Sequence, residues 1–195
     1  MISALACGSS VRDAEEPSRA AWLSSSKLDA RTRTSLQSFL AFHYAFSFQV
    51  ALARPLTAGE RQKLSRSQVV VSGDGLEVEA RAAPVKVEAL IELDAVRQVA
   101  CSRQRAAAPV SDAWLERLNH EAAEAWRADG CWITGHADVS GALDEEHRRQ
   151  LAELGAHVSG APPMISVVLP RDALPGLIGL PFVTRFSVEP AVYPN

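Results

Sequence analysis

The chain has 195 residues, enough for one or two domains and too few for a large multidomain enzyme. Hydrophobic residues make up 47% and charged residues 22%, values typical of globular proteins, which excludes wholesale disorder. The net charge is −3 and no long basic run occurs, so nucleic-acid binding is not predicted. No catalytic signature, cofactor motif or metal-ligand spacing occurs, so the sequence predicts no enzyme activity, cofactor or metal site.

The N-terminal segment carries a short motif around Cys7. Residues 4–10 resemble a bacterial lipobox, in which a signal peptidase cleaves before a cysteine that receives a lipid. With a longer signal upstream of Met1, the resemblance implies a membrane anchor on Cys7 and a location in the cell envelope or outside the cell. The alternative is an ordinary short N-terminus, with a cytoplasmic location left open. Residues 1–26 are rich in Ser, Ala and charge and are expected to form a flexible tether, with order beginning near Lys27.

The chain contains two similar copies, and the second part of one aligns without a gap with the second part of the other at an offset of 87 residues. Residues 56–64 align with 143–151, and each segment begins a helix with an N-cap residue, Thr57 or Asp144. Residues 71–73 align with 158–160 in the same frame. We interpret this pattern as an internal duplication, with two similar folds that arose independently as the alternative.

Alternating apolar residues and helix caps predict the same elements in each copy. The first copy is expected to contain strands at 46–52, 69–71, 76–82 and 96–101, with helices near 57–67 and from Pro84 onward. The second is expected to contain strands at 133–139, 156–159, 164–169 and 183–188, with helices at 144–154 and 172–179. This order of elements, βαββαβ, is that of the ferredoxin-like fold.

An extra helix is predicted before each copy, over 28–42 and 112–128, and the two helices are expected to pack the units together. The predicted fold class is therefore α+β, with two tandem ferredoxin-like units, each preceded by an extra helix. The first unit would span residues 27–105 and the second residues 110–195, including a C-terminal tail. Trp126 is expected to lie between the units.

Strand parity predicts which side chains face the core. Glu77, Glu79 and Arg81 are expected to face water or a partner, and the absence of stacking aromatics there disfavours RNA binding. Cys101 is expected on a core position and Cys131 just before the first strand of the other unit, so free thiols are predicted and no bridge between them. The residues expected in the core are Val78, Ala80, Val99, Cys101, Ile133, Ala137, Val139, Ile165, Val167, Leu169, Phe186 and Val188.

Several segments of the second copy are similar to a known family. Residues 154–158, 167–170 and 173–183 resemble the propeptide-type inhibitor modules that precede bacterial subtilisin-like proteases, and residues 54–57 and 89–99 resemble them in the first copy. The resemblance covers most of residues 27–190. It implies a ferredoxin-like fold whose open sheet face lies on helices of the protease, while the C-terminal residues enter the substrate cleft.

The resemblance implies binding rather than catalysis. Because no protease domain follows within these residues, a free-standing inhibitor or folding chaperone of a subtilisin-like protease is expected. Its partner-binding residues would be Glu77 and Glu79 on the sheet and a tail formed by Ala191, Val192, Tyr193, Pro194 and Asn195. Two alternatives stay open: a structural or interaction protein of the cell envelope, and a small-molecule sensor that binds its ligand between the paired units.

Overall fold

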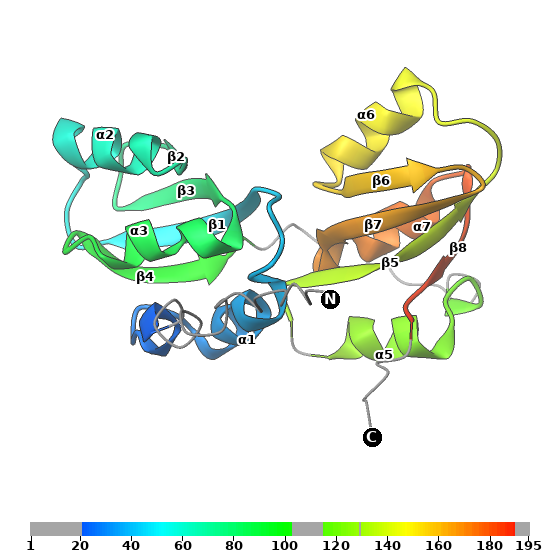
Figure 1. The fold of residues 1–195 in the computed structure, drawn as a ribbon, viewed down its shortest axis with the longest axis horizontal. Coiled ribbons are helices and arrows are strands. Elements are labelled where there is room, and N and C mark those ends of the chain that lie inside the picture. The colour runs from blue at the N-terminus through cyan, green and yellow to red at the C-terminus, as the bar shows by residue number, and fades with distance from the viewer. Residues whose placement is uncertain (1–20, 103–114, 129, 190–195) are drawn as a thin grey trace, which may run out of the picture.

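The computed structural model describes residues 21–102, 115–128 and 130–189 (Figure 1). It contains two four-stranded antiparallel sheets with helices packed against them, which confirms the predicted α+β class. We refer to the sheet formed by residues 46–101 as sheet A and to the sheet formed by residues 132–187 as sheet B.

Sheet A has the strand order β2-β3-β1-β4. Strand β1 is central, and its four apolar residues at alternate positions are no more than 3% exposed, because one face of the sheet packs against helices. Its strands are β1 Phe46–Leu52, β2 Val70–Ser72, β3 Glu77–Ala82 and β4 Val96–Cys101. Its helices are α2 Ala58–Arg66, the 3-10 turn η2 Pro84–Lys86 and α3 Glu88–Ile91.

Sheet B has the equivalent strand order β6-β7-β5-β8. Its strands are β5 Trp132–Val139, β6 His157–Ala161, β7 Met164–Pro170 and β8 Val183–Ser187. Its helices are α6 Glu145–Glu153, the 3-10 turn η3 Arg171–Ala173 and α7 Leu174–Gly179. Helix α2 begins at Ala58 and α6 at Glu145, which matches the predicted interval of 87 residues.

The second helical segment of each half is a 3-10 turn followed by a short α-helix, and η3 and α7 together span 171–179, close to the predicted 172–179. Pro84 opens a single 3-10 turn before the four-residue α3, and Pro175 lies in the first turn of α7. Proline supplies no N–H, so both helices begin where a donor is not required. The expected core residues are buried, apart from Val188, which is half-buried, and the side chains of Glu77, Glu79 and Arg81 are exposed as predicted.

The two halves carry an aromatic core ring on different strands. In sheet A, Phe48 of β1 is fully buried, whereas the residue 87 positions later in β5 is Gly135. In sheet B, Phe186 of β8 is fully buried, and its counterpart in β4 is Val99. A Cβ atom at Gly135 would collide with the backbone oxygen of Ser187 and with the ring of Phe186. The glycine therefore leaves the space that the Phe186 ring fills.

The leading segments cover one edge of each sheet. Helix α1 Ala30–Phe39 is capped by Asp29, and helix α5 His120–Arg127 by Asn119, so both are shorter than predicted. Leu28 forms a parallel bridge with Val99 of β4, and Leu118 forms one with Phe186 of β8. The 3-10 helix η1 Ala21–Ser24 buries Trp22 and Leu23. Ordered structure therefore begins before residue 27, which corrects the expected tether boundary.

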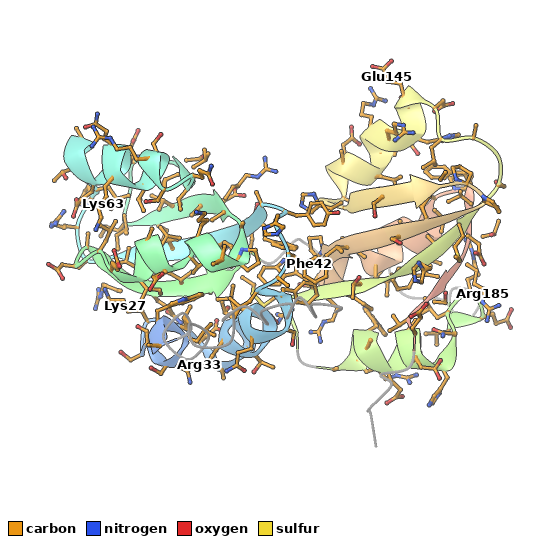
Figure 2. All side chains as sticks on the ribbon, viewed as in Figure 1. Lys27, Arg33, Phe42, Lys63, Glu145 and Arg185 are labelled. Carbon is orange, nitrogen blue, oxygen red and sulfur yellow. A yellow bond between two sulfur atoms is a disulfide. The ribbon has the colours of Figure 1, made fainter. Side chains whose placement is uncertain are left out.

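The two halves meet through an aromatic cluster. Trp132, the first residue of β5, lies with its ring centroid 4.3 Å from that of Phe46 and 5.5 Å from those of Phe39 and Phe48. His157 of β6 stacks on Tyr44 at 4.8 Å. Phe42 also lies where the halves meet (Figure 2). The prediction for Trp126 was wrong, since this residue packs against the core of its own half and Trp132 occupies the junction.

A disulfide joins the halves, and this corrects the prediction of free thiols. Cys101 at the end of β4 is bonded to Cys131 just before β5, with the two Cα atoms 5.9 Å apart. Both cysteines are buried. The prediction failed because strand parity describes positions within one unit, whereas the bond depends on how two strand ends approach each other across the junction.

Candidate functional site

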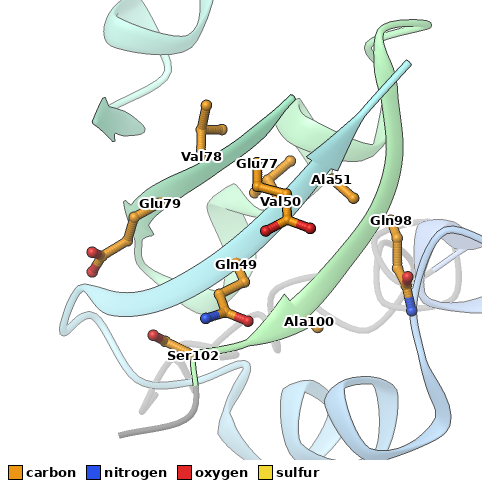
Figure 3. A pocket seen from close by; sticks show the side chains of 9 residues that line it. All are labelled: Gln49, Val50, Ala51, Glu77, Val78, Glu79, Gln98, Ala100 and Ser102. Atoms are coloured by element: carbon orange, nitrogen blue, oxygen red, sulfur yellow. The ribbon is translucent and has the colours of Figure 1, made fainter. Parts of the chain in front are cut away.

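Among the described residues, no helix covers the outward face of sheet A, which forms a shallow hollow of about 310 Å³. Cross-strand pairs on this face are Gln49 with Glu79 and Ala51 with Glu77, so β1 and β3 place amide and carboxylate groups side by side. Figure 3 shows these side chains on neighbouring strands. Gln98, Ala100 and Ser102 line the hollow from β4 and the residue that follows it. The floor is therefore polar and built from small or flexible side chains.

Both predicted sheet residues, Glu77 and Glu79, lie in this hollow. Neither carboxylate forms a hydrogen bond or ion pair with another residue in the described ranges. By contrast, Asp74 in the adjacent turn is paired with Arg61 at 3.0 Å. The two glutamates are therefore free to pair with groups that approach from outside.

The hollow continues in both directions along the sheet. It shares Ala51, Glu77 and Gln98 with a further hollow of about 540 Å³ beside Ser26 and Leu76. It shares Glu79 and Ser102 with a hollow of about 410 Å³ at the junction of the two halves. We call these three connected hollows the trough.

The outward face of sheet B is different, because the first half covers part of it. Thr134 pairs with Val168 on this face, yet Val168 and its neighbour in the sheet, Trp132, are buried in the core cluster of the first half. The uncovered part carries His136, whose Nδ1 lies 3.3 Å from Ser166 Oγ and whose Nε2 lies 3.4 Å from Glu189 Oε1. The side chain of Glu189 is 83% exposed, so this Ser–His–Glu contact is a hydrated surface network.

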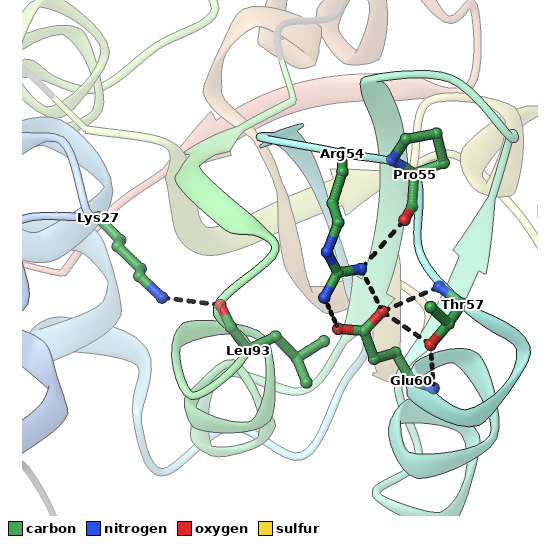
Figure 4. Close-up of polar contacts among 6 residues, drawn as sticks. All are labelled: Lys27, Arg54, Pro55, Thr57, Glu60 and Leu93. Carbon is green, nitrogen blue, oxygen red and sulfur yellow. Dashed lines mark hydrogen bonds and ion pairs between the residues drawn. The ribbon is translucent and has the colours of Figure 1, made fainter.

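Glu60, a carboxylate whose pKa is strongly lowered, lies away from the trough, at the start of α2 (Figure 4). Arg54 donates two hydrogen bonds of 2.8 Å to Glu60, and Thr57 donates to the same carboxylate from its backbone and its hydroxyl. These contacts lower the pKa of Glu60 to about 2. Thr57 and Glu60 together form the capping box of α2, so the role of this cluster is structural.

The remaining predicted site residues cannot be placed. Cys7 and the tail residues Ala191, Val192, Tyr193, Pro194 and Asn195 lie outside the described residues. Within the described ranges, no group of His, Cys, Asp and Glu side chains is arranged to hold a metal ion. In the same ranges, no helix has the length and apolar character needed to cross a membrane.

The residues that border the junction hollow from the second half were not predicted from the sequence. Trp132, His157 and Pro170 border the junction hollow from the second half, opposite Phe46 and Arg81 of the first. One available signal was that β5 begins with an aromatic residue on the outward parity, where a solvated face would carry a polar one.

No family model, no curated protein and no solved structure matches this chain. The resemblance to protease propeptides therefore stays a prediction from the residues that carry it.

Proposed function

We propose that this protein is a non-catalytic binding protein made of two tandem ferredoxin-like units, which acts as a propeptide-like inhibitor or folding chaperone of a subtilisin-like protease. The observation that supports it most directly is the face of sheet A, which no helix within residues 21–102, 115–128 and 130–189 covers and on which Glu77 and Glu79 are exposed. The strand order β2-β3-β1-β4 agrees with a ferredoxin-like unit.

In this proposal the face of sheet A docks on the protease, and the tail from Ala191 to Asn195 enters the substrate cleft as an extended strand. Sheet B is the less suitable docking face, because Trp132 and Val168 on that face are buried by the first half. Carboxylates at an exposed rim contribute mainly to the rate of association and to specificity. Glu77 and Glu79 are therefore expected to select a protease surface with positive charge.

The disulfide between Cys101 and Cys131 supports a location outside the cytoplasm. Disulfides persist mainly in secreted, periplasmic and cell-surface proteins. The proposed location is thus the cell envelope or the extracellular space, with lipid on Cys7 as the proposed anchor. The same bond favours the second candidate function, a structural or interaction protein of the envelope that inhibits no protease.

An inhibition assay against a panel of secreted subtilisin-like proteases tests the proposal. The intact protein is expected to inhibit at least one of them at micromolar concentration, and deletion of residues 191–195 is expected to abolish inhibition while the melting temperature is retained. Glu77→Lys should weaken inhibition about tenfold, whereas Glu145→Lys, the same charge change on the remote helix α6, should not. Absence of inhibition by the intact protein across the panel would leave the envelope interaction protein as the better account.

A further inference from the structure

We propose that the hollow at the junction of the two halves binds a small zwitterionic ligand, an amino acid or short peptide with a free ammonium, a free carboxylate and an apolar side chain. The hollow holds about 410 Å³ and is lined by both halves. Ligand pockets typically have about 300–1,000 Å³ and often lie between domains. This proposal goes beyond protease binding, since it concerns a small molecule and a different part of the trough.

The charges come from one strand. Glu79 and Arg81 are two residues apart on β3, so both side chains point to the outward face and lie about 7 Å apart along the strand. Both are exposed and line the hollow. Within the described part of the chain neither forms a hydrogen bond or an ion pair, so both charges remain available to a ligand. A carboxylate and a guanidinium at this spacing match the two ends of a zwitterion.

The opposite wall favours the ammonium end. Ala152 and Gly155 line the hollow at the carboxyl end of α6, where the carbonyls of residues 150–152 already accept hydrogen bonds from the N–H groups of residues 154–156, so this wall contributes only a weak helix-dipole attraction. This wall and the Glu79 carboxylate together attract a cation, while Arg81 provides the contact for the carboxylate.

The inner end supplies an apolar surface. Ala45 of the first half and Ala156 and Pro170 of the second line the hollow and are at least partly exposed, whereas the rings of Phe46 and Trp132, 4.3 Å apart, are almost fully buried. An apolar ligand side chain that contacts the exposed atoms of Ala45, Ala156 and Pro170 loses its contact with water, which adds affinity that does not depend on charge. Phe46 belongs to the first half and Trp132 to the second, so the site exists only when the halves are joined.

Isothermal titration calorimetry with the full chain and the dipeptide alanyl-phenylalanine tests the proposal. The wild-type protein is expected to bind the free dipeptide about tenfold more tightly than its N-acetylated or C-amidated forms. In Glu79→Gln, N-acetylation should no longer weaken binding, because the carboxylate that binds the ammonium group is absent. In Arg81→Gln, C-amidation should no longer weaken binding, because the guanidinium that binds the carboxylate is absent. Glu77→Gln, on the same strand but outside the junction hollow, is the matched control and should bind as the wild type does.

Absence of binding at millimolar dipeptide would overturn the proposal. Binding that is equally tight for the free and blocked dipeptides would overturn it too, and so would an equal loss of affinity in Glu77→Gln and Glu79→Gln. None of these measurements involves a protease, so failure here is distinguishable from failure of the proposed inhibition.

Discussion

Thr32 and Ser35, one turn apart on α1, each accept a hydrogen bond from the backbone of one half of the protein. Thr32 Oγ1 accepts from the N–H of Cys101 at 2.9 Å, and Ser35 Oγ accepts from the N–H of Cys131 at 2.8 Å. Both side chains are buried, although polar, and Arg31 beside them donates two hydrogen bonds to the carbonyl of Gly130. Helix α1 therefore positions the two strand ends that the disulfide joins.

Loss of the Thr32 hydroxyl should destabilise the protein. Thr32→Val keeps the shape of the side chain but leaves the buried N–H of Cys101 without its acceptor, which costs about 1–3 kcal/mol. Urea unfolding measures the change in the free energy of unfolding. Thr34→Val on the exposed side of the same helix is the control, expected within about 0.5 kcal/mol of the wild type. Equal losses in the two variants would contradict the role assigned to Thr32.

The disulfide should add substantially to stability. Cys101 and Cys131 are 30 residues apart, and closing a loop of that length lowers the entropy of the unfolded chain by an amount equivalent to about 3–4 kcal/mol. Cys101→Ala with Cys131→Ala is thus expected to unfold at lower urea concentration than the oxidised wild type. Reduction of the wild type should give a similar shift. Because Cys7 is a third cysteine, titration of three free thiols instead of one in the unfolded, unreduced protein would show that the bond is not formed.

Gly135→Ala should be destabilising, although it adds only one methyl group. The new Cβ would meet the backbone oxygen of Ser187 and the ring of Phe186, so a strand or a core ring must shift, at a cost of about 1–3 kcal/mol. Gly179→Ala is the matched control, because a Cβ there meets no atom within 4 Å. Its expected effect is neutral or slightly stabilising. Differential scanning calorimetry should separate the two variants clearly, and equal melting temperatures would contradict the packing described for sheet B.

Glu60 should titrate far below its ordinary pKa of 4.5, at about 2, because Arg54 and Thr57 donate hydrogen bonds to its carboxylate. Since the pKa of Glu60 is lower in the folded than in the unfolded state, its ionised carboxylate stabilises the fold. This contribution to the free energy of unfolding is complete above pH 4.5 and is lost as the pH falls towards 2. An NMR titration of the side-chain carboxyl measures this pKa directly. Arg54→Gln is expected to raise it, and Arg66→Gln, which alters an exposed arginine at the end of α2, is expected to leave it low. Titration near 4.5 in the wild type would contradict the contacts described.

The sequence allowed the elements within each half to be predicted, because their signals are local. The alternation of apolar residues from Phe46 to Leu52 and the caps Thr57 and Asp144 each depend on a few neighbouring residues. The exposure of Glu77 and Glu79 was predicted by the same parity. These signals describe one half at a time.

The junction was not predictable in this way. Cys101 and Cys131 come together because α1 binds both strand ends, and Thr32 and Ser35 occur in the sequence as ordinary polar residues of a helix. Trp132 has the parity of an outward residue and is buried only because the first half covers that part of sheet B. Tertiary packing therefore determines which groups border the junction hollow, and local sequence patterns do not predict that packing.

The partial covering of sheet B by the first half has a consequence for binding stoichiometry. Two equivalent faces would make the chain bivalent, and one molecule could then link two partners into larger assemblies. With Trp132 and Val168 buried at the junction, the face of sheet A is the sheet face that the described part of the chain leaves open along the trough. The second half thus enlarges the support for one binding surface, and a sheet-face partner is expected in a one-to-one complex.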